Sequence, residues 1–186
     1  MEIKFAKIGI CGLSCRLCPH YHMNTSSRCL GCKSDDRIKV GCPFITCAIK
    51  RKGIEFCWDC AEHEICEKWK KHREAGKKVD SFKCYQKLED DIAFIHKRRI
   101  EEFEKTQKIR EQLLKEMLAE FNEGRSKSYY CIAATVLEIG ELEQALAEAK
   151  QKSNGLDIKG KSRYLHSILD DIARKKKYYL KIRRRE

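Results

Sequence analysis

Ten of the twelve cysteines in this 186-residue chain lie between Cys11 and Cys66. Three pairs have the spacing C-x2-C, namely Cys15 and Cys18, Cys29 and Cys32, and Cys57 and Cys60. Two intervening residues form a tight turn that can direct both sulfur atoms at one tetrahedral ion. The fold of this segment is therefore constrained first by what its thiols bind.

Disulfide bonding is the main alternative to metal ligation for so many cysteines. It needs an oxidising compartment, but residues 1–5 open no apolar signal-peptide core. The chain also has no apolar stretch as long as a membrane span. We therefore expect a cytoplasmic protein without a membrane partner, whose reduced thiols bind metal.

We expect two zinc ions held by thiolates. The candidate ligands are the ten clustered cysteines, Cys11, Cys15, Cys18, Cys29, Cys32, Cys42, Cys47, Cys57, Cys60 and Cys66. The first site would use Cys15, Cys18, Cys29 and Cys32, and the second Cys42, Cys47, Cys57 and Cys60. Cys11 and Cys66 are then spare, and they could exchange into either site, belong to a third site or stay unligated. Interleaved pairing of the C-x2-C motifs is equally tetrahedral, so the spacing leaves the pairing open.

An iron–sulfur cluster is an alternative cofactor, because thiolates alone do not separate zinc from iron. Cys11, Cys15 and Cys18 also have the C-x3-C-x2-C spacing of radical S-adenosylmethionine enzymes. Those enzymes resemble partial barrels of alternating strands and helices, and this chain has neither the strand signals nor the length. A redox role for the spare thiols Cys11 and Cys66 is a related alternative.

The order of the cysteine motifs resembles that of one family. CGLSCRLCPHY is followed by CLGC, then by CPFITCAIKRKG, and then by CWDC. Over about residues 8–70, this order is similar to the cysteine-rich archaeal and bacterial proteins grouped as domain of unknown function 3795. The resemblance implies a zinc-binding module of undetermined activity, and it covers nothing beyond that segment.

The composition changes near Lys83. Both prolines and six of the ten glycines precede it, whereas Glu, Lys, Ile, Leu and Ala dominate after it. Apolar residues at three- and four-residue steps predict one long helix over residues 81–121, a second helix over about 126–152 and a third from Ser162 onward. We therefore expect a small metal-stabilised Cys-rich domain (residues 1–80) and an all-α antiparallel three-helix bundle with one long helix (residues 81–186).

The formal net charge of +12 suggests a nucleic-acid partner. Two tetrathiolate zinc sites would each contribute about −2 and lower this charge to about +8. The firmest basic feature is residues 174–185, which contain eight basic residues and no acidic one. Candidate phosphate contacts are Lys175, Lys176, Lys177, Arg183, Arg184 and Arg185. A solvated helix end favoured by the helix dipole is the alternative.

Signals of enzymatic activity are weak. The chain contains no P-loop, G-x-G-x-x-G, G-x-S-x-G or H-E-x-x-H motif. Sites filled by four thiolates also leave no position for the water that hydrolytic zinc requires. We therefore expect a non-enzymatic zinc protein with a binding or scaffolding role. The sequence leaves its partner, protein or nucleic acid, unspecified.

Overall fold

The cysteine-rich segment folds mainly as turns and short helices. In the computed structural model, which describes residues 2–81 and 83–184, the helices of this segment are η1 (Cys15–Leu17), α1 (Asp35–Val40), α2 (Pro43–Ile45), η2 (Thr46–Lys52), η3 (Cys57–Asp59) and α3 (Glu67–Lys78). No β-strand forms within the described residues, and only an isolated bridge joins Ile8 to Ser14. Three small apolar clusters lie in this segment and against its neighbours, so little of the segment is held by a large core.

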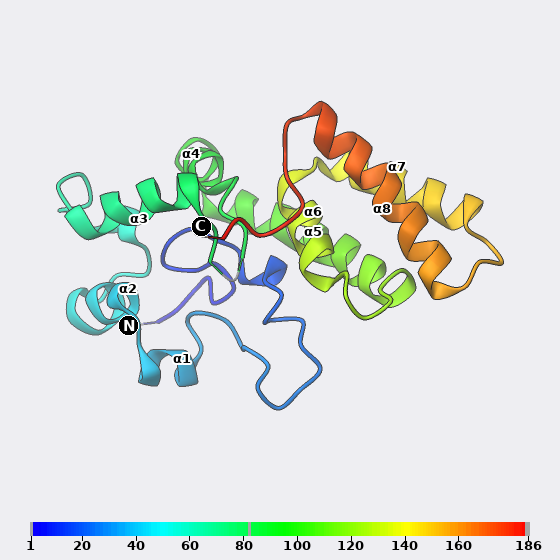
Figure 1. Cartoon of the computed structure of the whole chain (residues 1–186). Helices are drawn as coiled ribbons and strands as arrows, with labels where there is room; N and C mark the ends of the chain where they lie inside the picture. The colour runs from blue at the N-terminus through cyan, green and yellow to red at the C-terminus, as the bar shows by residue number, and fades with distance from the viewer. Residues whose placement is uncertain (1, 82, 185–186) are drawn as a thin grey trace.

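The remainder of the chain forms longer helices around one larger core. They are α4 (Leu88–Arg98), α5 (Ile100–Glu120), α6 (Lys127–Val136), α7 (Ile139–Lys152) and α8 (Ile158–Lys175). The apolar residues of α6 are buried almost completely, because α5, η1 and α8 pack against that helix. Figure 1 shows α1, α2 and α3 at one end of the molecule and α7 and α8 at the other.

The prediction of one continuous helix over residues 81–121 is wrong, because two helices form there. The helical run begins only at Leu88, and it is interrupted at Arg99 between α4 and α5. Arg99 has φ 76° and ψ 154°, a conformation that glycine adopts far more readily than a residue with a Cβ atom. The sequence places no glycine or proline there, so the hydrophobic periodicity gives no sign of this interruption.

The predicted second helix is also divided in two. The chain is extended at Leu137, and α7 restarts with Glu138 as its N-cap. The Glu138 and Glu141 side chains accept hydrogen bonds from each other's backbone in a capping box. Five helices, α4 to α8, therefore stand where three were expected among the described residues.

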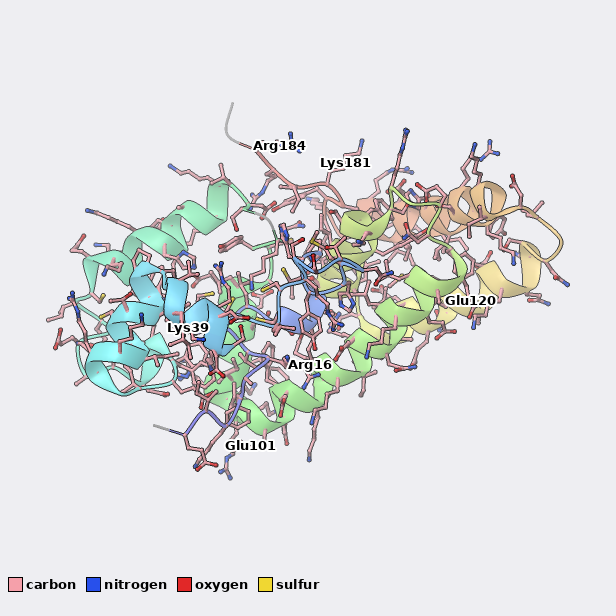
Figure 2. All side chains as sticks on the ribbon, turned by 90° about the horizontal axis from the view of Figure 1, so that it is seen from below. Arg16, Lys39, Glu101, Glu120, Lys181 and Arg184 are labelled. Carbon is pink, nitrogen blue, oxygen red and sulfur yellow. The ribbon has the colours of Figure 1, made fainter. Side chains whose placement is uncertain are left out.

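The basic C-terminal segment was predicted to continue the third helix, but most of it is not helical. Helix α8 ends at Lys175, and residues 176–184 form a tail that turns back toward the loop between α3 and α4 (Figure 1). Figure 2 shows Lys181 and Arg184 on this tail at the edge of the molecule. The Arg183 guanidinium donates hydrogen bonds to the carbonyls of Gly76 and Lys77, at the C-terminal end of α3.

Asp80 fastens the tail to the loop before α4. Its carboxylate is fully buried and accepts hydrogen bonds from the backbone N–H groups of Tyr85 (2.8 Å) and Arg183 (3.0 Å). The Tyr179 hydroxyl donates a third at 3.3 Å. The Asp80 N–H donates in return to the Arg183 carbonyl at 3.0 Å. One buried acid therefore joins two segments about a hundred residues apart in sequence.

Element η1 joins the cysteine-rich segment to the helical core. Leu17 is buried within the core formed by α5 to α8. Arg16 pairs with Glu111 at 2.7 Å and Glu104 at 3.0 Å, both on α5. Figure 2 shows Arg16 beside that helix. These contacts cross the expected boundary between residues 80 and 81, and the division into two domains stays a prediction.

Arg99→Gly should stabilise the protein by about 1–3 kcal/mol, because glycine removes the strain of a Cβ atom at positive φ. Lys97→Gly, at an exposed position inside α4, is the matched control and should destabilise by about 1 kcal/mol. Urea denaturation measures both changes. A loss of stability in Arg99→Gly equal to that in the control would contradict the strained conformation.

Asp80→Asn should destabilise the fold by about 3 kcal/mol, because it removes a buried charge that three donors depend on. Asp171→Asn is the control, since that carboxylate forms an exposed pair with Arg174 and should change stability by less than about 1 kcal/mol. Equal unfolding midpoints for the two variants would show that Asp80 does not hold the tail.

Candidate metal centre

The first thiol cluster consists of Cys15, Cys18, Cys29 and Cys32, which line one cavity of about 440 Å³. These are the four residues that the sequence assigned to the first site. The cavity is also lined by Lys83, which comes from the loop before α4, and by His20 and Arg28. The cavity of the first cluster is therefore formed by the cysteine-rich segment together with the loop that follows α3.

Local backbone geometry builds this cluster. The Cys15 N–H donates to the Lys7 carbonyl at 2.7 Å, which fixes the start of η1. Gly31 has φ 114°, so the turn before Cys32 needs the glycine that occupies it. That turn brings the Cys32 N–H to within 3.3 Å of the Cys15 sulfur. An amide that donates to sulfur stabilises the thiolate form, which is the form that binds metal.

The next residue, Lys33, anchors the same turn. Its ammonium group is buried, pairs with Glu55 at 2.8 Å and lies 3.6 Å from the centre of the Phe56 ring. Glu55 also accepts a hydrogen bond from the Phe5 N–H at 2.8 Å. A buried ion pair and a cation–π contact therefore position the first cluster where the segment has little apolar core.

The second thiol cluster consists of Cys47, Cys57, Cys60 and Cys66, which line a cavity of about 110 Å³ together with His63. They come from η2, η3, the turn after η3 and the N-cap of α3. The Cys57 N–H donates to the Ile10 carbonyl at 3.1 Å, which joins η3 to the segment before Cys11. The Lys52 ammonium donates to the Cys60 sulfur at 3.1 Å.

Cys42, which was expected in the second site, does not join the second cluster, and Cys11 lines neither cavity. Cys42 is the N-cap of α2, where its sulfur accepts a hydrogen bond from the Ile45 N–H at 3.4 Å. It does not line the cavity of the second cluster, whereas Cys66 does. Cys11 interacts electrostatically with Cys32 of the first cluster and with Cys57 of the second. The sulfurs of Cys11 and Cys32 both lie near Gly9. Cys11 also packs against the same apolar cluster as Cys57 and Cys66.

The thiols influence one another's protonation. A hydrogen bond with the Cys32 thiol lowers the pKa of Cys15, and the same bond together with burial raises the pKa of Cys32. Burial and the charges of neighbouring cysteines raise the pKa of Cys57 to about 12. Several thiolates cannot be held this close together without a cation nearby.

Lys83 is a buried cation beside the first cluster, and the sequence reasoning missed it. Burial favours its neutral form, but Cys15, Cys32, Cys11 and Cys18 together raise the pKa of Lys83 above its usual value. Nothing in the local sequence marks this lysine, because its position depends on the path of the chain between α3 and α4. The other two cysteines, Cys84 and Cys131, are buried thiols of the helical core.

All twelve cysteines are free thiols. Among the described residues, no three Cys, His, Asp or Glu side chains already stand in an arrangement that would hold a metal ion. The donor chemistry of each cluster nevertheless fits zinc, since each brings four sulfur atoms to the wall of one cavity.

The candidate nucleic-acid contacts are dispersed. Lys176 pairs with Glu141 at 3.0 Å, and Arg183 is used in fastening the tail. Lys175 ends α8, Lys177 follows at φ 60°, and Arg184 is exposed. Arg185 lies outside the described residues. These residues do not form one continuous basic helix face.

The comparisons with known proteins agree with the motif order. Residues 7–71 match the family described as Protein of unknown function (DUF3795). This match confirms the expected resemblance, and it covers both thiol clusters but well under half of the chain. No curated protein and no solved structure matched the chain. No helix in the described ranges has the length and apolar character needed to cross a bilayer.

A partly buried acid lines a cavity together with Lys83 at the junction of the two segments. Asp91, Ser14, Gln107, Thr135 and Lys83 line a cavity of about 10 Å³, which is room for about one water molecule. Burial raises the pKa of Asp91 to about 7, although Arg110 opposes this change.

Because the pKa of Asp91 is higher in the folded than in the unfolded chain, the folded state binds its proton more tightly. The acid should therefore cost stability progressively as the pH rises from about 4 to about 7. Asp91→Asn should remove this pH dependence, whereas Asp90→Asn, at an exposed carboxylate, should keep it. Urea unfolding at pH 5 and pH 7.5 gives the comparison, and identical pH slopes in wild type and Asp91→Asn would refute the shift.

Proposed function

We propose that this chain is a zinc-binding protein in which each thiol cluster holds one structural zinc ion. The observation that supports this most is that two separate cavities are each lined by four cysteines. The proposed ligands are Cys15, Cys18, Cys29 and Cys32 for the first ion and Cys47, Cys57, Cys60 and Cys66 for the second. Four thiolates complete a tetrahedral shell and leave no position for a catalytic water.

The second ligand set replaces Cys42 of the original expectation with Cys66. Cys66 lines the cavity and is the N-cap residue of α3, where its side chain makes no capping hydrogen bond and so remains available as a ligand. The sulfur of Cys42 is instead used to cap α2. Cys11 is proposed as a spare thiol near both sites.

The role of the metal would be to hold the cysteine-rich segment together. Binding of one structural zinc ion provides about 10–16 kcal/mol, which a segment with only small apolar clusters needs. Thiolate ligands require reduced cysteines, so the proposal includes a reducing compartment such as the cytoplasm. The ordered segment and the helices packed on it would then serve as a binding or scaffolding element without enzymatic activity.

An iron–sulfur cluster is a second candidate for the first site alone. The cavity of the first cluster is about 440 Å³ against about 110 Å³ for the second, and Cys11 lies near it as a fifth thiol. A cluster of several iron and sulfur atoms needs more room than one zinc ion, and thiolates ligate both.

Elemental analysis of anaerobically purified protein should find two zinc ions per chain and no visible absorption. Cys66→Ser should retain one zinc ion, because it removes a proposed ligand of the second site. Cys42→Ser, a matched control in the same segment, should retain two. Iron with visible absorption would favour the second candidate. One zinc ion in Cys42→Ser and two in Cys66→Ser would reverse the ligand assignment.

A further inference from the structure

Lys83 lies against the first thiol cluster although it belongs to the loop before α4. The residue is only 5% exposed, and it lines the same cavity as Cys15, Cys18, Cys29 and Cys32. A buried ammonium group is stable only beside groups of opposite charge. The four sulfur atoms of the cluster, once deprotonated, are such groups.

Residues near Lys83, namely Asp80 and residues 84–86, are held in place by hydrogen bonds. Cys84 is buried in the helical core, and its sulfur accepts hydrogen bonds from Gln86. The Gln86 side chain also binds the backbone of Tyr179 in the tail through two hydrogen bonds, of 2.8 Å and 3.2 Å. On the other side, Asp80 is fastened to the tail by Arg183. The position of the Lys83 side chain is therefore set by the fold, unlike that of a surface lysine.

Two acids share a cavity with Lys83. Asp36 lines the cavity of the first cluster but is exposed to solvent, and Asp91 lines a second, smaller cavity. Burial of Asp91 favours its neutral carboxylic acid. The thiolates of the first cluster are thus the anions best suited to balance the lysine. The second cluster has a contrasting lysine, because the Lys52 side chain that contacts Cys60 is 30% exposed and also pairs with Glu62.

We propose that Lys83 is a positioning residue of the first metal site, whose ammonium group donates hydrogen bonds to the ligand sulfurs and offsets part of their negative charge. This inference rests on the proposed zinc function. A tetrathiolate zinc site carries a charge of about −2, and one fixed cation beside it reduces the total to about −1. The lysine should therefore strengthen zinc binding and make the bound thiolates less nucleophilic.

The test compares full-length variants loaded with zinc. Lys83→Met should lower zinc affinity at the first site by about 10- to 100-fold, as loss of an outer hydrogen-bond partner does in other metal sites. Lys83→Arg keeps the charge and the donors and should restore most of the affinity. Lys152→Met removes the same charge at an exposed position on α7, where Lys152 pairs with Glu148, and should leave affinity at both sites unchanged.

Two readouts separate this inference from the proposed function. Elemental analysis of the wild type tests whether zinc binds at all. Iodoacetamide alkylation, mapped cysteine by cysteine by mass spectrometry, then reports on each site. In Lys83→Met the first-cluster cysteines should react about tenfold faster or more, and the second-cluster cysteines at the wild-type rate. A wild type with two zinc ions and no change in Lys83→Met would overturn the role of Lys83 alone.

A measurement on the unaltered chain covers the case in which Lys83→Met does not fold. In lysine-¹⁵N-labelled wild type, loading with cadmium-113 should shift one lysine ammonium signal and couple it to the metal through an N–H···S bond. Lys83→Arg should lack that signal and so assign it. If no lysine ammonium signal responds to metal, Lys83 does not contact the ligand sulfurs and the proposal is wrong.

Discussion

Repulsion between closely spaced thiolates is the constraint on which the cysteine-rich segment depends. Cys15 and Cys32 share a hydrogen bond, and Cys57 is surrounded by the charges of Cys11, Cys47, Cys60 and Cys66. Such an arrangement is favourable only when the sulfurs stay protonated or when a cation lies among them. The segment buries only small apolar clusters, so a metal ion at each cavity would supply the cross-links that a larger core provides elsewhere.

The same constraint links the two ends of the chain. Element η1 carries Cys15 and also places Leu17 in the helical core, while Arg16 pairs with α5. From the other direction, the C-terminal tail holds the loop that carries Lys83 against the first cluster. Contacts with the helical core and the C-terminal tail therefore fix the positions of Cys15 and Lys83, which both line the first cavity.

The sequence predicted the helical class and the grouping of the first four cysteines around one cavity, because these follow from local composition and from the C-x2-C spacing. It did not predict the interruption at Arg99, where the conformation favours glycine but the residue is arginine. The spacing of Glu138 and Glu141 is compatible with a capping box and so with a helix start at this point. The continuous apolar pattern on both sides favoured a single helix instead. The place of Lys83, and the exchange of Cys66 for Cys42, depend on contacts between distant segments that spacing cannot encode.

The central claim is that sulfur alone surrounds each metal ion, and X-ray absorption at the zinc edge of the purified protein tests it most directly. The account predicts four sulfur neighbours per zinc at about 2.3 Å and no nitrogen or oxygen in the first shell. A first shell containing nitrogen would bring His20 or His63 into a site and contradict the tetrathiolate assignment. A purified, reduced protein without bound zinc would contradict the account as a whole.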